Sequence, residues 1–189
     1  MIYFTSDLHF GHSNIIRYDN RPFNTVTSMD LSLIENWNKT VTPLDTTYIL
    51  GDISWYGEAR TIEILKKLNG EKILIKGNHD KVTRGVAAQF KEVTDYKELH
   101  FEENVHVVLC HYPIVFFNRR HYGAYMFYGH VHVSTDYQFC ESYKREIREM
   151  GGKCNMFNVG CMLYNYTPQT FAQIIQKDKE VMVDDPKSE

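Results

Sequence analysis

The segment Ile2-Tyr3-Phe4-Thr5-Ser6-Asp7-Leu8-His9 joins a short apolar run to a polar cluster, and the same arrangement recurs along the chain. Short apolar runs rich in β-branched and aromatic residues are typical of buried strands. The recurrences, and a sixth run that ends in glycine, lie at residues 47–52, 72–80, 105–111, 125–132 and 156–160. We therefore expect six strands, five of which end beside an aspartate, an asparagine or a histidine.

Helical patterns separate these runs. Ser28 is a typical N-cap for a helix from Met29 to Lys39. The segment 58–68 carries one apolar stripe and is followed by Gly70, while the charged segment 141–150 predicts an exposed helix. Strands that alternate with helices predict an α/β domain, in which the carboxyl ends of the strands converge on one rim and bind ligands there.

The composition limits the class of protein. A chain of 189 residues suits one domain, which we place at residues 1–176, with a charged C-terminal tail at 177–189. The formal charge of −3 argues against a stable nucleic-acid complex held by bulk charge. No apolar run approaches the roughly 18 residues of a membrane span, and the N-terminus lacks the basic start of a signal peptide. The four cysteines form no CxxC motif and indicate reduced thiols, so we expect a cytoplasmic protein without a membrane partner, of open oligomeric state.

The polar side chains at the strand ends are the types that bind metal. They are Asp7, His9, Asp52, Asn78, His79, His111, His130 and His132. Carboxylates and imidazoles suit borderline and hard divalent ions, and no thiolate belongs to the set. Taken singly, each motif is also compatible with an ordinary turn or cap, as Gly51-Asp52 illustrates. Their position at successive strand ends favours a site for two ions about 3.5–4 Å apart, with Asp52 as the bridge.

The order of these motifs resembles that of the calcineurin-like metallophosphoesterase superfamily. The motifs are Asp7-Leu8-His9, Gly51-Asp52, Gly77-Asn78-His79-Asp80, Cys110-His111 and Gly129-His130-Val131-His132. Within the superfamily, residues 7–16 are similar to the opening of small stand-alone prokaryotic and phage members. The resemblance implies a four-layer αββα sandwich of two mixed sheets, with the site along one edge.

The resemblance also implies the role of each residue. Asp7, His9 and His132 would hold one metal, Asn78, His111 and His130 would hold the other, and Asp52 would bridge them. His79 would face the substrate as a stabiliser or as the proton donor to the leaving oxygen. The cofactors would be two divalent transition metal ions, with Mn²⁺ favoured over Fe, Zn, Ni or Co. Together they would neutralise phosphate oxygens and activate a shared hydroxide for in-line attack on phosphorus.

The function we expect is hydrolysis of a small phosphodiester or phosphomonoester, such as a nucleotide. The alternatives are a metal-dependent nuclease and a catalytically silent binding module. The chain departs from the protein phosphatases of the superfamily, in which an acid and an arginine follow Gly-Asp and orient the catalytic histidine. Residues 53–56 contain neither, so the partner of His79 stays open.

Substrate-binding candidates follow the first motif. We expect His12, Arg17 and Arg21 at the rim of the site, since arginine offers a two-pronged donor to phosphate oxygens. The basic, aromatic stretch 118–122 is expected either to overhang the metals or to be a solvated loop. The segment 134–153 reads as an insertion near the site.

Overall fold

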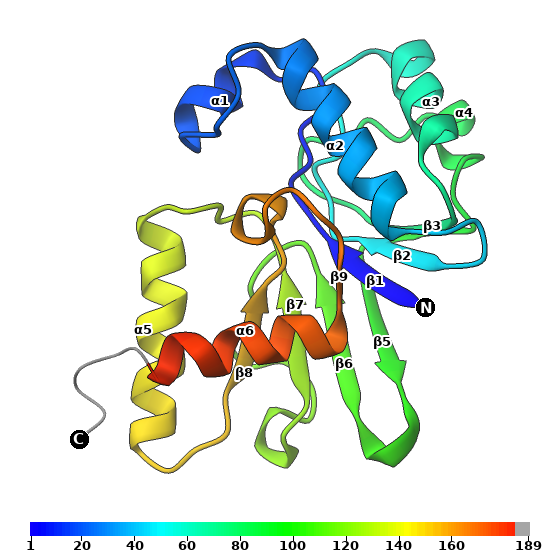
Figure 1. Ribbon diagram of the computed structural model, residues 1–189. Coiled ribbons are helices and arrows are strands. Elements are labelled where there is room, and N and C mark those ends of the chain that lie inside the picture. The colour runs from blue at the N-terminus through cyan, green and yellow to red at the C-terminus, as the bar shows by residue number, and fades with distance from the viewer. Residues whose placement is uncertain (184–189) are drawn as a thin grey trace.

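Two β-sheets packed face to face, with helices on their outer sides, make up the computed structural model, which describes residues 1–183 (Figure 1). The first sheet has the strand order β4-β3-β2-β1-β9. Its strands are β1 (Ile2–Thr5), β2 (Thr46–Ile49), β3 (Glu71–Ile75), β4 (Glu92–Thr94) and β9 (Gln169–Thr170). Strands β1 to β4 run parallel, and β9 pairs antiparallel with β1.

The second sheet has the strand order β5-β6-β7-β8. Its strands are β5 (Tyr96–His100), β6 (His106–Cys110), β7 (Tyr125–Tyr128) and β8 (Asn155–Asn158). Strands β6 to β8 run parallel, and β5 pairs antiparallel with β6 at the edge. Both sheets are therefore mixed, which confirms the predicted sandwich of two mixed sheets flanked by helices.

Helices cover both outer faces. They are α1 (Ser13–Tyr18), α2 (Val26–Thr40), α3 (Glu58–Lys67), α4 (Arg84–Ala87), α5 (Thr135–Glu149) and α6 (Phe171–Val183), with 3-10 helices at Glu102–Asn104, Arg120–Tyr122 and Cys161–Tyr164. Helices α2 and α3 pack on the first sheet and α5 packs on the second, while α6 contributes Ile174 to the core between the sheets. Across residues 1–183, no helix has the length and apolar character needed to cross a bilayer.

Successive side chains of the central strands point to opposite faces of the sheet, and both faces are buried. In β1, Tyr3 packs toward α2 and α3, whereas Phe4 packs into the core between the sheets. In β7, Phe127 faces that same core, and its neighbour Met126 faces α5. A parallel strand buried on both sides reads in the sequence as a continuous apolar run. This burial is the reason why the six runs could be recognised.

All six predicted strands are present. The apolar parts of the predicted runs, residues 2–5, 47–50, 72–76, 105–109, 125–128 and 156–159, differ from the observed strands by at most one residue at each end. Strands β4, β5 and β9 were not predicted from the sequence. These strands lie at sheet edges, and their residues are half-buried or exposed, so they form no apolar run. The four cysteines are free, as the spacing predicted.

Two helix predictions were wrong in detail. Helix α2 begins at Val26 rather than Met29, because Thr25 is the N-cap and accepts a hydrogen bond from the backbone N–H of Ser28. Ser28 instead closes a capping box by accepting from the backbone N–H of Thr25. Helix α5 begins at Thr135 and is not exposed throughout, since Cys140 and Lys144 are buried against the second sheet.

The predicted C-terminal tail is in part helical. Helix α6 continues to Val183, so residues 177–183 extend the last helix rather than leave it. Residues 184–189 lie outside the described part of the chain. The domain limit at residue 176 stays a prediction.

The core between the sheets gives a test of this packing. Phe127 is fully buried and contacts the rings of Phe4, Phe157 and Phe171. We expect Phe127→Ala to lower the free energy of unfolding by about 3–5 kcal/mol, through lost burial and the cavity it leaves. Urea denaturation measures this change. The exposed Phe116 is the matched control, and Phe116→Ala should change stability by about 0.5 kcal/mol or less. Equal losses for both variants would contradict the assigned core.

Candidate metal centre

The ends of five strands bring the predicted ligands to one edge of the sandwich. From the first sheet, Asp7 and His9 follow β1, Asp52 follows β2, and Asn78 follows β3. From the second sheet, His111 follows β6, and His130 and His132 follow β7. The carboxyl ends of neighbouring parallel strands meet at the same edge, so residues distant in sequence come together.

Left-handed backbone conformations aim these side chains. Five of the predicted ligands have positive φ angles: Asp7 at 56°, His9 at 53°, Asp52 at 55°, His130 at 71° and His132 at 49°. Residues other than glycine rarely adopt this conformation, and it concentrates at functional sites. The strands stop before the ligands, so tight left-handed turns rather than strand alternation direct the side chains inward.

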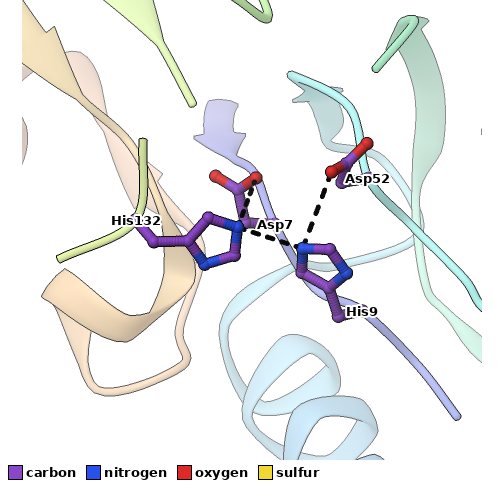
Figure 2. Close-up of side chains that lie close together, drawn as sticks. All are labelled: Asp7, His9, Asp52 and His132. Atoms are coloured by element: carbon purple, nitrogen blue, oxygen red, sulfur yellow. Dashed lines mark hydrogen bonds and ion pairs between the residues drawn. The ribbon is translucent and has the colours of Figure 1, made fainter. Parts of the chain in front are cut away.

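The first donor cluster consists of Asp7, His9, Asp52 and His132, whose donor atoms all lie within 4.8 Å of one another. Figure 2 shows the two imidazoles facing each other. Their Nε2 atoms lie 3.2 Å apart. Nε2 of His9 lies 3.6 Å from Oδ2 of Asp52, and Nε2 of His132 lies 3.7 Å from Oδ1 of Asp7. Four buried or half-buried N and O donors thus converge on one point, an arrangement that could hold a metal ion.

The second donor cluster consists of Asn78, His111, His130 and the other oxygen of Asp52. Oδ1 of Asn78 lies 3.1 Å from Nε2 of His111 and 3.0 Å from Nδ1 of His130. Nε2 of His111 lies 3.6 Å from Oδ1 of Asp52. The seven ligands predicted from the sequence therefore come together, and Asp52 faces both clusters.

Hydrogen bonds behind the clusters fix the tautomers of two histidines. Nδ1 of His132 lies 2.9 Å from both carboxylate oxygens of Asp19, and Nδ1 of His111 lies 2.7 Å from the backbone oxygen of Leu50. An acceptor at Nδ1 places the proton there and leaves the Nε2 lone pair free to bind a metal. Both Nε2 atoms point into the clusters.

Arg21 was predicted at the rim of the site, and this prediction was wrong. The side chain of Arg21 is fully buried beneath the first cluster. Its guanidinium donates hydrogen bonds to the carboxylate of Asp19 and to the backbone oxygens of Asp7 and Leu8. Every face of the guanidinium is therefore directed at the protein. Arg21 holds Asp19 and the turn that carries Asp7, and it cannot reach a substrate.

Asp80 belongs to the motif Gly77-Asn78-His79-Asp80, but the sequence did not indicate its structural role. Its carboxylate accepts hydrogen bonds from three backbone N–H groups, those of Asp52, Ile53 and Gly77, at 3.0, 2.8 and 2.8 Å. It therefore ties the loop after β2 to the loop after β3. The available signal in the sequence was an aspartate five residues after a buried strand, and only its partners in space reveal what it does.

Two glycines permit this close approach. Gly51 has a φ of +86°, and a Cβ built on it would lie 2.4 Å from Nδ1 of His111. A Cβ on Gly77 would lie 2.3 Å from Oδ1 of Asp52. A larger residue at either position would displace a donor of the clusters.

Burial and neighbouring charges shift the pKa of several donors. Burial raises the pKa of the Asp7 carboxyl, and burial lowers the pKa of His9 and of His130. Burial also acts to lower the pKa of His132, but the hydrogen bond to Asp19 and two nearby negative charges outweigh it and raise the pKa. A cation would stabilise the ionised carboxylates, and neutral imidazole is the form that binds metal. The donor set thus suits a divalent transition metal.

An open cleft of about 630 Å³ lies beside the clusters. Its lining includes His9, His12, Asn14, Ile15, Tyr18, Asp19, Trp55, His79, Val131, Val133, Ser134 and Asp136, together with His130 and His132. His12 and His79 therefore line the cleft, and their roles in substrate binding and catalysis stay predictions. Arg17 is exposed, with its guanidinium 5.4 Å from the ring centroid of Tyr18, and it is not among the residues that line the cleft.

The two loop predictions have different outcomes. The stretch 118–122 does not overhang the metals, because the 3-10 helix Arg120–Tyr122 lies at the opposite end of the second sheet (Figure 1). There the side-chain amide of Asn155, the first residue of β8, donates to the backbone oxygen of Gly123. The segment 134–153 does approach the site, since Ser134 and Asp136 at the start of α5 line the cleft.

Comparisons with known proteins agree with this geometry. Residues 1–178 match the calcineurin-like phosphoesterase superfamily domain. The uncharacterized protein MJ1445 of Methanocaldococcus jannaschii is 34% identical over 187 residues, which span 95% of this chain and 94% of that protein. The gene 66 protein of Mycobacterium phage L5 is 38% identical over 81 residues, 41% of this chain and 39% of that protein. The crystal structure of AQ665, a protein of unknown function from Aquifex aeolicus, has a TM-score of 0.72 and 28% identity, covering 94% of this chain and 98% of that chain.

The contact between Asp19 and His132 gives a test of the metal centre. We expect Asp19→Asn to weaken metal binding about tenfold or more, because the neutral amide supports the metal-binding imidazole less well than a carboxylate. Titration calorimetry with Mn²⁺ measures the dissociation constant. The control is Asp95→Asn, at an exposed aspartate that is paired with Lys76 and belongs to neither donor cluster. Unchanged affinity in Asp19→Asn would contradict the assigned support.

Proposed function

Because this chain belongs to the calcineurin-like phosphoesterase superfamily, we propose that it is a metal-dependent hydrolase of a small phosphodiester or phosphomonoester, such as a nucleotide. One observation carries the proposal. The two oxygens of Asp52 face different clusters, Oδ2 at 3.6 Å from Nε2 of His9 and Oδ1 at 3.6 Å from Nε2 of His111. A carboxylate in this position is suited to bridge two cations.

Each donor cluster would hold one ion. Asp7, His9 and His132 would bind the first, and Asn78, His111 and His130 would bind the second. The nitrogen and oxygen donors admit Mn²⁺, which we favour, and also Fe, Zn, Ni or Co. When bound, a pair of such ions supplies positive charge to the phosphate oxygens and lowers the pKa of a water that attacks phosphorus. Because His79 lines the cleft beside the clusters, the ester would be bound with its leaving oxygen on the cleft side.

His79 is placed to serve that leaving oxygen. Its backbone N–H donates to Oδ1 of Asp52 at 3.0 Å, so its position is tied to the bridging carboxylate. Its ring is exposed in the cleft, with its centroid 6.2 Å from that of His9. An imidazole at this place would donate a proton to the leaving oxygen as its bond to phosphorus breaks.

The cleft favours a small ester over a nucleic acid. No lysine or arginine is among the described residues that line it, whereas Asp19 and Asp136 are. Binding a polyanion relies on many cationic contacts, which this surface does not offer. A catalytically silent binding module is also disfavoured, because all seven donors and His79 are retained at the site.

Removing the bridge tests the proposed reaction. Asp52→Asn should lower kcat/KM by about 10³-fold, since stabilisation of transition-state charge by metal ions contributes several kcal/mol. The assay is hydrolysis of bis-p-nitrophenyl phosphate and p-nitrophenyl phosphate with Mn²⁺, alongside the metal content of the purified protein. Asp95→Asn is the control. Metal-loaded wild type that hydrolyses neither ester would contradict the proposal, and the preferred ester distinguishes a diesterase from a monoesterase.

Removing the proton donor has a different signature. We expect His79→Asn to lower kcat for a phenyl ester, whose leaving group needs a proton, by about 10²-fold or more. The metal content should stay unchanged, because His79 is not a member of either donor cluster. Mass spectrometry of bound metal and steady-state kinetics measure the two quantities on the same sample. Loss of metal together with activity would contradict this role and assign His79 to the metal centre.

A further inference from the structure

The ring of His79 has no hydrogen-bonding partner in the described part of the chain. Its backbone N–H is held by Asp52, and the neighbouring Asp80 anchors the loop, so the backbone at this point is fixed. The imidazole itself is exposed, and an exposed side chain changes rotamer within picoseconds to nanoseconds unless something restrains it. A proton donor must lie within hydrogen-bond reach of the leaving oxygen, so the orientation of this ring matters.

Trp55 is the residue that packs against this ring. The centroids of Trp55 and His79 are 4.3 Å apart, with an angle of 49° between the rings. Trp55 is itself packed against His12, at 4.0 Å and nearly parallel. His12 thus covers one face of the indole, although Trp55 as a whole is 44% exposed.

The backbone around Trp55 is tied to the loop that carries His12. The N–H of Trp55 donates to the backbone oxygen of Phe10 at 2.8 Å, and the N–H of Phe10 donates to the backbone oxygen of Ile53 at 2.9 Å. These bonds continue the pairing of the first two strands beyond their ends. The indole therefore sits on two short, mutually hydrogen-bonded segments.

Asp30, on helix α2, adds a second tie between these segments. Its carboxylate accepts hydrogen bonds from the backbone N–H of Gly11 at 3.1 Å and from the hydroxyl of Tyr56 at 2.9 Å. Gly11 has a φ of +78°, and a Cβ there would lie 2.6 Å from the Tyr56 ring. The residues next to His12 and Trp55 are consequently packed together and anchored to the same helix.

We propose that Trp55 is the positioning residue of His79: the indole, backed by His12, restrains the imidazole so that it points at the leaving oxygen of the substrate. The proposal rests on the proposed function and adds a residue to it. It also gives His12 a role behind Trp55 rather than in direct substrate binding. Ring packing would do here what a charged hydrogen-bonding partner could do elsewhere, because residues 53–56 provide neither an acid nor an arginine.

The proposal predicts a dependence on the leaving group. During hydrolysis the attacking water gives one proton to the solvent and forms a bond to phosphorus. The ester P–O bond breaks with its electron pair on the leaving oxygen, which takes a proton from His79, and the solvent then reprotonates His79. A p-nitrophenolate is stable enough to leave with little protonation, whereas phenolate depends more on the donor. A misplaced His79 should therefore impair phenyl esters more than p-nitrophenyl esters.

Kinetics of three variants test this dependence, with Mn²⁺ and the ester class that the wild type prefers. Trp55→Ala should lower kcat for the phenyl ester about tenfold or more, lower it less for the p-nitrophenyl ester and leave KM unchanged. Trp55→Phe should restore most of the loss. Tyr122→Ala, an 80% exposed aromatic at the opposite end of the second sheet, is the control. A rise in KM alone would overturn the proposal and show that Trp55 contacts the substrate instead.

A measurement that needs no turnover separates the two proposals. In zinc-loaded protein, the ring protons of His79 should resonate upfield because of the nearby indole, and His79→Asn identifies their signals by removing them. The upfield shift should disappear in Trp55→Ala and persist in Tyr122→Ala. Normal shifts for His79 in the wild type would overturn the positioning role. Failure of the wild type to hydrolyse any ester would instead overturn the proposed function, and the resonances alone would then decide the packing.

Discussion

The carboxylates of Asp7 and Asp52 are buried where the carboxyl ends of the two sheets meet, and almost no solvent reaches either of them. Removing a carboxylate from water without an opposite charge costs several kcal/mol. In the described part of the chain, the groups within ion-pair distance of these two side chains are imidazoles. A cation between the carboxylates removes this cost, so the same feature that would destabilise an empty site favours metal binding.

The rest of the edge is organised around those two acids. Left-handed turns direct the donors inward, and such turns persist only where surrounding contacts impose them. Arg21 holds the turn after β1 from below, and Asp80 holds the turns after β2 and β3 through three backbone N–H groups. The charged side chains of Arg21 and Asp80 thus hold the main chain in place by hydrogen bonds. Replacing Arg21 or Asp80 would therefore disturb the metal centre, although neither residue is a predicted ligand.

The cleft side of the centre has a different character. Donors on the metal side are held by hydrogen bonds, as Asp19 and Leu50 hold His132 and His111. On the cleft side, His79 is held by the packing of an aromatic ring. Hydrogen bonds fix a tautomer and a lone pair, which a ligand requires. Packing restrains direction while leaving both ring nitrogens free, which would suit the proton transfer that we propose for His79.

The sequence by itself determined the central strands and the polar residues that follow them, because a parallel strand buried on both faces reads as a continuous apolar run and the residues after it lie at the sheet edge. It did not determine β4, β5 or β9, because these edge strands are partly exposed and form no continuous apolar run. Arg21 and Arg17 look alike in the sequence, and only the tertiary structure shows one guanidinium buried under Asp7 and the other in solvent. The tertiary structure also reveals which contacts Asp19, Asp80 and Trp55 make with the site. Each acts on a residue far away in sequence or through backbone groups, and no local pattern encodes such a contact.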